Sequence, residues 1–241
     1  MTDKKQITVL QLYPRDMNIY GDWGNTLVLK RRLEWHGYEV NLLAYNPGDS
    51  FPNDVDIIVG GGGQDSGQDI IQNDLLKIAP VLRKLADDNV PMLMICGLFQ
   101  LFGKFFKTQD GHVIEGIGLL DLETHAGNER LTGNIITESE QFGEIIGYEN
   151  HSGQTFLGRD VQPLGKVIKG AGNNGQDDTE GARYRNVIAT YMHGSLLPKN
   201  PAIADFLIEQ AVTRKYGAFT PTVIDDRFAE LARGVASKRP R

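Results

Sequence analysis

The sequence predicts an α/β protein with a mostly parallel central sheet, helices on both faces and added antiparallel strands at one edge. In the N-terminal part of the chain, short apolar runs of strand length alternate with longer stretches of helical periodicity. Such alternation is typical of parallel sheets covered by helices. In the middle of the chain, short β-branched pieces separated by glycines resemble hairpins more than helices.

The length allows one or two domains, and because no linker is long enough to divide the chain, we expect a single domain over 1–241, with 220–241 as a C-terminal helix and basic tail. The 241 residues are 40% hydrophobic, which suffices for a sizeable core. A net charge of -6 argues against nucleic-acid binding, which needs a basic surface. The single cysteine excludes an internal disulfide, so we expect a cytoplasmic protein. No apolar run approaches the length of a membrane span, so we expect no stable membrane insertion.

The first half of the chain supplies the predicted elements that build the sheet. In order they are a strand at 7–12, a helix at 25–35, strands at 39–43 and 56–59, and a helix at 66–89. In the first helix we expect Val28 and Trp35 to be buried and Arg32 to face water. We expect Pro80 to kink or split the second helix.

The remaining elements follow a strand at 91–95. They are hairpin-like pieces at 111–122 and 130–147, a strand at 186–192 and two amphipathic helices. The apolar stripe of the first helix comprises Ile203, Phe206, Leu207 and Ala211, and that of the second comprises Phe228, Leu231, Ala232 and Val235. We expect both stripes to dock on the sheet or on a partner.

Two reactive side chains end predicted strands. Cys96 follows an apolar strand and precedes a helix, where the first helical amides stabilise a thiolate. His193 ends a late apolar strand just before Gly194. A buried cysteine packed as a small hydrophobe and a structural histidine are the alternatives. Because ligands bind at the carboxyl ends of parallel strands, we expect Cys96 and His193 to share a crevice.

Two glycine-rich segments require separate interpretations. The 60–63 loop follows a strand, but no Lys-Ser or Lys-Thr closes it as in a nucleotide-binding loop. We expect one of its amides to donate to an oxyanion, with a plain turn as the alternative. The 170–181 segment contains a formal G-x-G-x-x-G, but no apolar helix follows, so we interpret it as an exposed loop. No histidine pair has zinc-binding spacing, so we predict neither a metal nor a cofactor.

Together these residues resemble the class I, triad-type glutamine amidotransferases, and within them the cobyric-acid-synthase-like branch. Cys96 with Gln100 four residues later, the glycine-rich loop and the strand ending in His193 carry this resemblance. Two stretches, 149–153 and 193–197, are similar to that branch. Three more, 18–25, 61–65 and 130–134, are similar to the glutaminase subunits of lipid II isoglutaminyl synthases from Gram-positive bacteria. The resemblance extends from about residue 7 to 219, and the length agrees with a stand-alone subunit.

The resemblance implies a role for each matched residue. Cys96 would be the nucleophile and His193 its base, and Gly62 and Gly97 would donate to the oxyanion. The implied substrate-binding residues are Arg130, Gln100, His151 and Gly153. The planar guanidinium of Arg130 suits the α-carboxylate of L-glutamine, although an isolated arginine in a polar stretch can equally be a solvated surface residue. His151 could instead cap a loop.

Two positions depart from the family pattern. Ser195 stands where many class I members carry an acid, so a Cys-His dyad is implied, with His193 oriented by another group. Leu98 and Phe99 occupy an elbow where relatives commonly place a glycine at the second position after the cysteine. The departure at Leu98 puts the tightness of that turn, and therefore the oxyanion geometry, in question.

The resemblance also implies a partner, because ammonia released into water becomes ammonium and loses its nucleophilic lone pair. The implied partner is a MurT-like, ATP-dependent Mur-ligase subunit in a heterodimer. It would use the ammonia to amidate D-glutamate of the lipid II stem peptide. Two alternatives stay open: a glutaminase that serves another amidating synthetase, such as a cobyrinate type, and a non-catalytic scaffold with a degenerate amidotransferase fold.

Overall fold

A computed structural model describes residues 5–240, which form two six-stranded sheets. The first sheet has the order β11-β12-β4-β3-β1-β2. Its strands, in chain order, are β1 (Gln6–Leu12), β2 (Glu39–Tyr45), β3 (Ile57–Gly60), β4 (Met92–Ile95), β11 (Ala182–Tyr184) and β12 (Val187–Thr190). All neighbouring strands pair in parallel except β11, which is antiparallel to β12. The predicted parallel sheet is confirmed.

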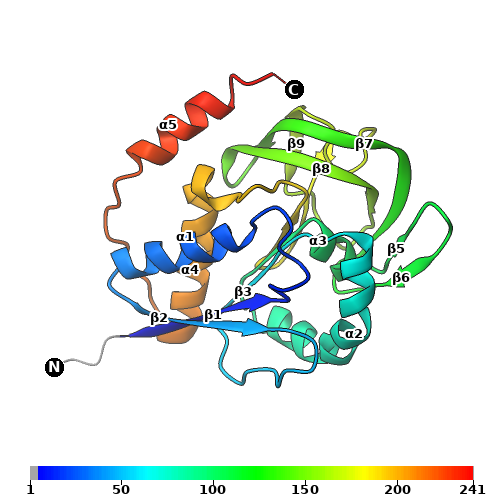
Figure 1. The fold of residues 1–241 in the computed structure, drawn as a ribbon. Helices are drawn as coiled ribbons and strands as arrows, with labels where there is room; N and C mark the ends of the chain where they lie inside the picture. The colour runs from blue at the N-terminus through cyan, green and yellow to red at the C-terminus, as the bar shows by residue number, and fades with distance from the viewer. Residues whose placement is uncertain (1–4, 241) are drawn as a thin grey trace.

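Helices connect and cover these strands. They are α1 (Trp23–Trp35), α2 (Asp65–Asp87), α3 (Gly97–Phe102), α4 (Pro201–Tyr216), α5 (Arg227–Ala236) and a short 3-10 turn, η1 (Leu197–Lys199). The β1-α1-β2 and β3-α2-β4 units run in opposite directions along the sheet, so right-handed crossovers place α1 and α2 on opposite faces. Helices α1 and α4 contact each other (Figure 1). Within the described residues, no helix is long and apolar enough to cross a membrane.

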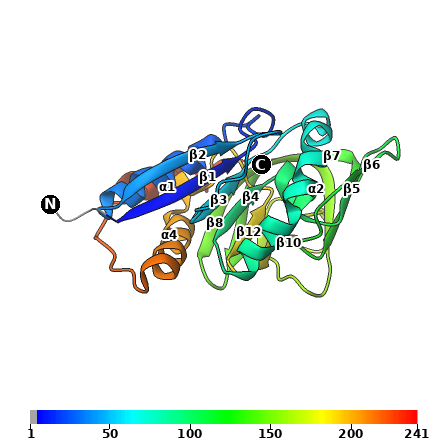
Figure 2. The same cartoon turned by 90° about the horizontal axis from the view of Figure 1, so that it is seen from below.

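The strands predicted at one edge form a second sheet instead. Its order is β10-β9-β7-β5-β6, with β8 paired to β7. Its strands are β5 (Phe105–Lys107), β6 (Val113–Glu115), β7 (Leu122–Ser139), β8 (Gly143–Leu157), β9 (Gly165–Lys169) and β10 (Thr179–Glu180). Long antiparallel pairing of β7 with β8 builds this sheet, which lies beside the first (Figure 2). A bridge between Tyr148 and His193 joins the two sheets.

The predicted buried face of α1 is wrong. Trp35 is 51% exposed and Val28 is only half-buried, whereas Arg32 is buried. Arg32 donates two hydrogen bonds of 2.7 Å to Asp205 and a third, of 2.6 Å, to Asp226. These ion pairs offset the cost of removing the guanidinium from water. Hydrophobic spacing alone could not reveal carboxylates that come from the far end of the chain.

Two further expectations differ from the structure at least in part. Of the two outcomes expected at Pro80, splitting does not occur, because α2 continues through Pro80, which lies on its exposed side; the kink stays a prediction. The 170–181 segment was expected to be an exposed loop, but its first residues are buried. The reason is Glu149, whose carboxylate accepts hydrogen bonds of 2.8 Å from the amides of both Ala171 and Gly172. A buried carboxylate needs such donors, and a glycine-rich loop supplies them.

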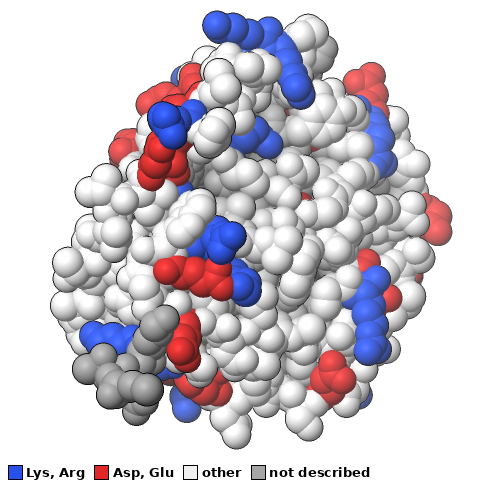
Figure 3. Space-filling view, turned by 60° about the vertical axis from the view of Figure 1, so that its left-hand side comes forward, with Lys and Arg blue, Asp and Glu red and all other residues white. Residues whose placement is uncertain are grey.

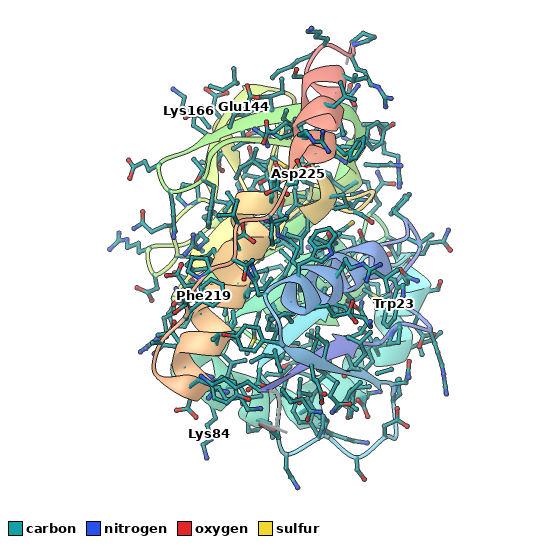
Figure 4. All side chains as sticks on the ribbon, turned by 90° about the vertical axis from the view of Figure 1, so that its left-hand side faces the viewer. Trp23, Lys84, Glu144, Lys166, Phe219 and Asp225 are labelled. Atoms are coloured by element: carbon teal, nitrogen blue, oxygen red, sulfur yellow. The ribbon has the colours of Figure 1, made fainter. Side chains whose placement is uncertain are left out.

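The two C-terminal helices behave differently. On α4 the predicted stripe docks, because Ile203, Leu207 and Ala211 are fully buried. On α5 the stripe does not dock on this chain, since Phe228 is 77% exposed and Leu231 is 65% exposed. Docking of the α5 stripe on a partner stays a prediction. The chain runs from Phe219 past Asp225 to reach α5, as Figure 4 shows. Polar contacts hold this helix, including 2.8 Å hydrogen bonds from Arg233 to the carbonyls of Lys199 and Glu144.

On the face shown in Figure 3, acidic and basic side chains intermix without a continuous basic area.

Candidate active site

The predicted reactive residues lie at one edge of the first sheet. Strands β1, β3, β4 and β12 are parallel and end together there. Thr190 is in register with Ile95, and the Cys96 amide donates to the Thr190 carbonyl at 2.9 Å. Cys96 and His193 therefore follow adjacent strand ends. A polar pocket of about 360 Å³ opens at this edge, and its wall includes Gly63, Cys96, Gln100, Arg130, His151 and Gly153.

Cys96 occupies a strained turn between β4 and α3. Its φ of 51° and ψ of -103° place a non-glycine residue at positive φ, a conformation that proteins retain chiefly at functional sites. The side chain is 6% exposed and contributes to the pocket wall. Leu98, at the position where relatives place a glycine, is fully buried. Gly60 makes room for it, because a Cβ on Gly60 would lie 2.2 Å from the Leu98 Cδ1.

The Cys96 thiol is neutral in this structure. Burial and, second to it, the nearby Asp22 carboxylate raise its pKa to about 12. The Gly97 amide hydrogen-bonds the sulfur and acts in the opposite direction. The expected stabilisation by α3 is therefore present, but it is smaller than the cost of burying a thiolate. In this state, a base must remove the proton before the sulfur can attack.

The glycine-rich loop after β3 approaches the sulfur closely. A Cβ on Gly62 would lie 3.0 Å from the Cys96 Cβ and 3.4 Å from its Sγ. The Gly62 amide, however, donates to the Asp22 Oδ2 at 2.9 Å. Gly63 lines the pocket, and its nitrogen lies 3.1 Å from a Cβ placed on Gly97. The loop thus lies where an oxyanion site requires it, with the Gly62 amide already engaged.

His193 lies behind the pocket wall. Its side chain is buried, with 1% of its surface exposed, and it does not line the pocket. Its Nε2 is 3.4 Å from the Asn150 carbonyl oxygen, and its Nδ1 finds no partner within 5–240. The Tyr20 ring, which does line the pocket, packs on the imidazole with centroids 4.1 Å apart. Burial lowers the pKa of His193 to about 4, so the imidazole is neutral, as a general base must be.

Arg130 reaches the pocket from a bulge. The β7-β8 register shifts between Ala126 and Leu131, and such irregularities redirect side chains at functional sites. The Arg130 Nε donates to the Asn150 Oδ1 at 2.5 Å, and its Nη2 donates to the Tyr20 hydroxyl at 3.1 Å. Arg130 lines the pocket while remaining exposed. Its guanidinium therefore has the access that a carboxylate-binding group needs.

The other three predicted substrate-binding residues also meet at the pocket. Gln100 donates to the Tyr191 hydroxyl at 3.0 Å and accepts from Gln68 at 3.0 Å. His151 stacks on the Tyr191 ring, with centroids 3.6 Å apart and planes inclined by 4°. Burial lowers the pKa of His151 to about 3. Because a carbonyl oxygen only accepts, the His151 Nδ1–H donates a hydrogen bond to the Gly153 carbonyl at 2.7 Å. A Cβ on Gly153 would lie 2.3 Å from the Gln100 Nε2. Together they form a rigid polar wall.

Sequence reasoning gave no role to Tyr20 or Asp22, although both lie in the 18–25 stretch. Asp22 is fully buried beside Cys96, and burial raises its pKa to about 6. Its Oδ1 has no hydrogen-bond partner within the described part of the chain. The available signal was the pair of glycines, Gly21 and Gly24, close to the start of a helix. As for metals, no group of three or more His, Cys, Asp or Glu within 5–240 is arranged to hold an ion.

Comparison with known proteins extends these observations. Residues 8–201 match the CobB/CobQ-like glutamine amidotransferase domain. The lipid II isoglutaminyl synthase (glutamine-hydrolyzing) subunit GatD of Staphylococcus aureus is 39% identical, covering 97% of this chain and 96% of that protein. The corresponding subunit of Streptococcus pneumoniae is 41% identical, covering 88% of this chain and 83% of that protein.

A solved structure agrees on the fold. PurLQS from Thermotoga maritima has a TM-score of 0.58 and 18% identity, covering 88% of this chain and 99% of that chain. At this identity the likeness concerns architecture alone. The family expected from the sequence is confirmed by the match over 8–201 and by the relatives that align with most of the chain. The chain belongs to the CobB/CobQ-like glutamine amidotransferase family.

Proposed function

We propose that this chain is the glutamine-hydrolysing subunit of a lipid II isoglutaminyl synthase. The observation that carries the proposal is the strained Cys96 turn, which opens into a polar pocket with Arg130 on its wall. A core cysteine needs neither the strain nor the pocket. Both GatD subunits named above align with this chain over most of their own length, which supports the assignment to that synthase.

In the proposed reaction, Cys96 attacks the side-chain carboxamide carbon of L-glutamine. His193 accepts the thiol proton and later transfers it to the departing nitrogen, so ammonia leaves and a glutamyl thioester remains on Cys96. Water activated by the same imidazole then hydrolyses the thioester to glutamate. The thiol's raised pKa makes the base necessary, and the lowered pKa of His193 keeps that base neutral.

Backbone amides would stabilise the tetrahedral oxyanion. The Gly97 amide already faces the sulfur. For the second donor we propose Gly63, which lines the pocket, or Gly62 once its amide is released from Asp22. A well-placed donor of this kind contributes roughly 3 kcal/mol to lowering the barrier in comparable sites. Whichever amide donates, a side chain at Gly62 would crowd the nucleophile, because a Cβ there would lie 3.0 Å from the Cys96 Cβ.

Substrate recognition is assigned to the remaining pocket residues. The Arg130 guanidinium would bind the α-carboxylate, which distinguishes glutamine from an amide within a protein chain. Gln100, His151 and Gly153 would form the wall against which the substrate lies. The hydrogen bonds of Gln100 with Tyr191 and Gln68 indicate that it shapes this wall before it contacts a ligand. These partners fix its amide orientation.

The ammonia acceptor is proposed to be a MurT-like, ATP-dependent ligase subunit that amidates D-glutamate of lipid II. Ammonia has to reach its acceptor before protonation removes the lone pair, so the two subunits would form a heterodimer. We place this reaction in the cytoplasm, where ATP is available to the ligase. The alternative acceptor, a cobyrinate-type synthetase, predicts a different partner in a pull-down.

A coupled assay with two nitrogen donors tests the proposal. The chain is combined with the MurT-like subunit, ATP and lipid II, and amidation is followed with either L-glutamine or ammonium chloride. Cys96→Ala should abolish amidation from glutamine and leave amidation from ammonium intact, because only the glutaminase step uses the thiol. Glutamine-dependent amidation by Cys96→Ala would contradict the mechanism. Absence of glutamine hydrolysis by the unmodified complex would favour the scaffold alternative.

A further inference from the structure

A closed ring of contacts links the base to the substrate-binding arginine. The Tyr20 ring packs on the His193 imidazole, and the Tyr20 hydroxyl accepts a hydrogen bond from the Arg130 Nη2. The Arg130 Nε donates to the side chain of Asn150, whose backbone carbonyl lies 3.4 Å from the His193 Nε2. These residues come from the loop after β1, from β7, from β8 and from the end of β12. The ring therefore joins both sheets at the site.

In this arrangement Tyr20 screens His193 from the pocket. Tyr20 lines the pocket together with Cys96 and Arg130, whereas His193 does not. The imidazole has a weak contact at Nε2 and none at Nδ1 within 5–240, so no strong hydrogen bond fixes it. The aromatic ring contributes the main packing contact on its pocket side. Tyr20 itself is half-buried on a connecting loop, a position from which a side chain can move.

We propose that Tyr20 is a positioning residue that keeps His193 out of the glutamine pocket until the substrate's α-carboxylate replaces the Tyr20 hydroxyl on Arg130. The inference rests on the proposed function, because it uses Arg130 as the carboxylate-binding group and His193 as the base. The substrate that takes the place of the hydroxyl on Arg130 also displaces the Tyr20 ring from the imidazole. The His193 imidazole then has access to the Cys96 thiol, and the two residues act together in one site.

The exchange favours substrates with a free carboxylate. A guanidinium binds a carboxylate through charge-assisted hydrogen bonds, which are roughly twice as strong as those to a neutral hydroxyl. A ligand shifts a conformational equilibrium only by its differential affinity for the two states. An amide without an adjacent carboxylate gains nothing from displacing Tyr20, so it leaves the base screened. Tyr20 would thus add specificity for free glutamine to that supplied by Arg130.

The first test separates a competing hydroxyl from a substrate-binding one. Tyr20→Phe keeps the ring on His193 and removes the hydrogen bond from Arg130. If the hydroxyl competes with substrate, the KM for L-glutamine should fall about threefold to tenfold, with kcat within about twofold. A KM that rises or stays constant would overturn the proposal. Tyr184→Phe is the matched control, because Tyr184 lies on β11, where its hydroxyl approaches Asp87, and should leave both constants unchanged.

The second test measures the screening of the base. Within the described part of the chain, Tyr20, Arg130 and His151 are titratable or charged groups that face His193. Tyr20→Ala admits water to the imidazole, which removes part of the burial that lowers its pKa. The acid limb of kcat/KM should then move up by at least about one pH unit toward the ordinary histidine value. Tyr20→Phe should leave that limb in place. An unmoved acid limb in a folded Tyr20→Ala protein would overturn the proposal.

A measurement without turnover separates this inference from the proposed function. The imidazole C–H signals of His193, assigned with His193→Gln, can be titrated by NMR in the unmodified chain and in both Tyr20 variants. A raised His193 pKa in Tyr20→Ala alone supports the screening role even if glutamine is not hydrolysed. Equal His193 titration in all three proteins defeats the screening role even if hydrolysis is normal. Melting temperatures establish that each variant is folded.

Discussion

Removing the charge of Asp22 should make the Cys96 thiol more reactive. Asp22→Asn keeps an oxygen to accept the Gly62 amide hydrogen bond but cannot ionise. At pH 8 the native carboxylate is charged, because burial raises its pKa only to about 6. That negative charge beside the sulfur opposes formation of the thiolate. The carboxamide introduced by Asp22→Asn carries no such charge, so the pKa of the Cys96 thiol should fall.

The size of the effect follows from the distances. A Cβ on Gly62 would lie 3.4 Å from the Cys96 Sγ and 3.5 Å from the Asp22 Oδ2, so sulfur and oxygen are separated by less than about 7 Å. With an effective dielectric constant of about 20, two unit charges interact there by about 2 kcal/mol. Removing that repulsion lowers the thiol pKa by about 1.5. Because nucleophilicity falls partly with basicity, the net gain in alkylation rate should be about fivefold.

The assay is the rate of Cys96 alkylation by iodoacetamide, measured at pH 8 and at pH 5. The two proteins should differ at pH 8 and converge at pH 5, where native Asp22 is protonated. Asp65→Asn is the control, because Asp65 is the weaker of the two carboxylates that raise the thiol's pKa and should change the rate less. Equal or slower alkylation of folded Asp22→Asn at pH 8 would refute this electrostatic reasoning.

Three further predictions concern recognition, pH and stability. Arg130→Lys should raise the KM for L-glutamine about tenfold with kcat little changed, because an ammonium group cannot form a bidentate pair of hydrogen bonds with a carboxylate. Unchanged steady-state constants would exclude Arg130 from substrate recognition. In the unmodified enzyme, kcat/KM should show no loss from pH 8 to pH 6 and should fall with a midpoint near 4, because neutral His193 is the active form. A midpoint near the ordinary histidine value would contradict this. Burial raises the pKa of Glu180 from 4.5 to about 7, so ionisation destabilises the fold progressively above pH 4.5. Glu180→Gln should therefore raise the free energy of unfolding by up to about 3 kcal/mol at pH 8 and leave it unchanged at pH 4, as measured by urea unfolding. A variant that is less stable than the native protein at pH 8 would contradict this prediction.

The parallel sheet was predictable because its strands are apolar on both faces. β3, β4 and β12 are fully buried along their whole length, which gives uninterrupted apolar runs. The position of Cys96 followed from the same pattern, since it comes directly after such a run. The second sheet was harder to predict. β7 and β8 alternate buried and partly exposed residues over long stretches, and glycines within them resemble turns.

Contacts between distant segments explain the remaining differences. Arg32 looked solvent-facing because its partners, Asp205 and Asp226, are far away in sequence. The role of Tyr20 could not be derived from the sequence, since its contacts with His193 and Arg130 arise only when the two sheets meet. For the same reason, the amides at the start of the following helix predicted a stabilised Cys96 thiolate, whereas burial and a carboxylate brought close by folding raise the pKa of the thiol.

Helix α5 differs in part from its prediction, because its apolar face stays largely exposed within residues 5–240. Its apolar stripe was predicted correctly as a pattern on one face, but Phe228 and Leu231 face solvent in the folded chain. The spacing of apolar residues predicts which face of a helix is apolar, but it does not predict what covers that face. The helix is held through Arg233, a residue that the apolar pattern ignores.

The most direct test of the account is covalent trapping of the nucleophile. A glutamine analogue with a diazoketone in place of the carboxamide is incubated with the full chain and its ligase partner, and the modified peptide is located by mass spectrometry. The account predicts one adduct per chain, on Cys96, suppressed by excess L-glutamine and absent in Cys96→Ala. Modification at another residue, or a folded protein that L-glutamine fails to protect, would contradict the claim that Cys96 is the nucleophile of a glutaminase.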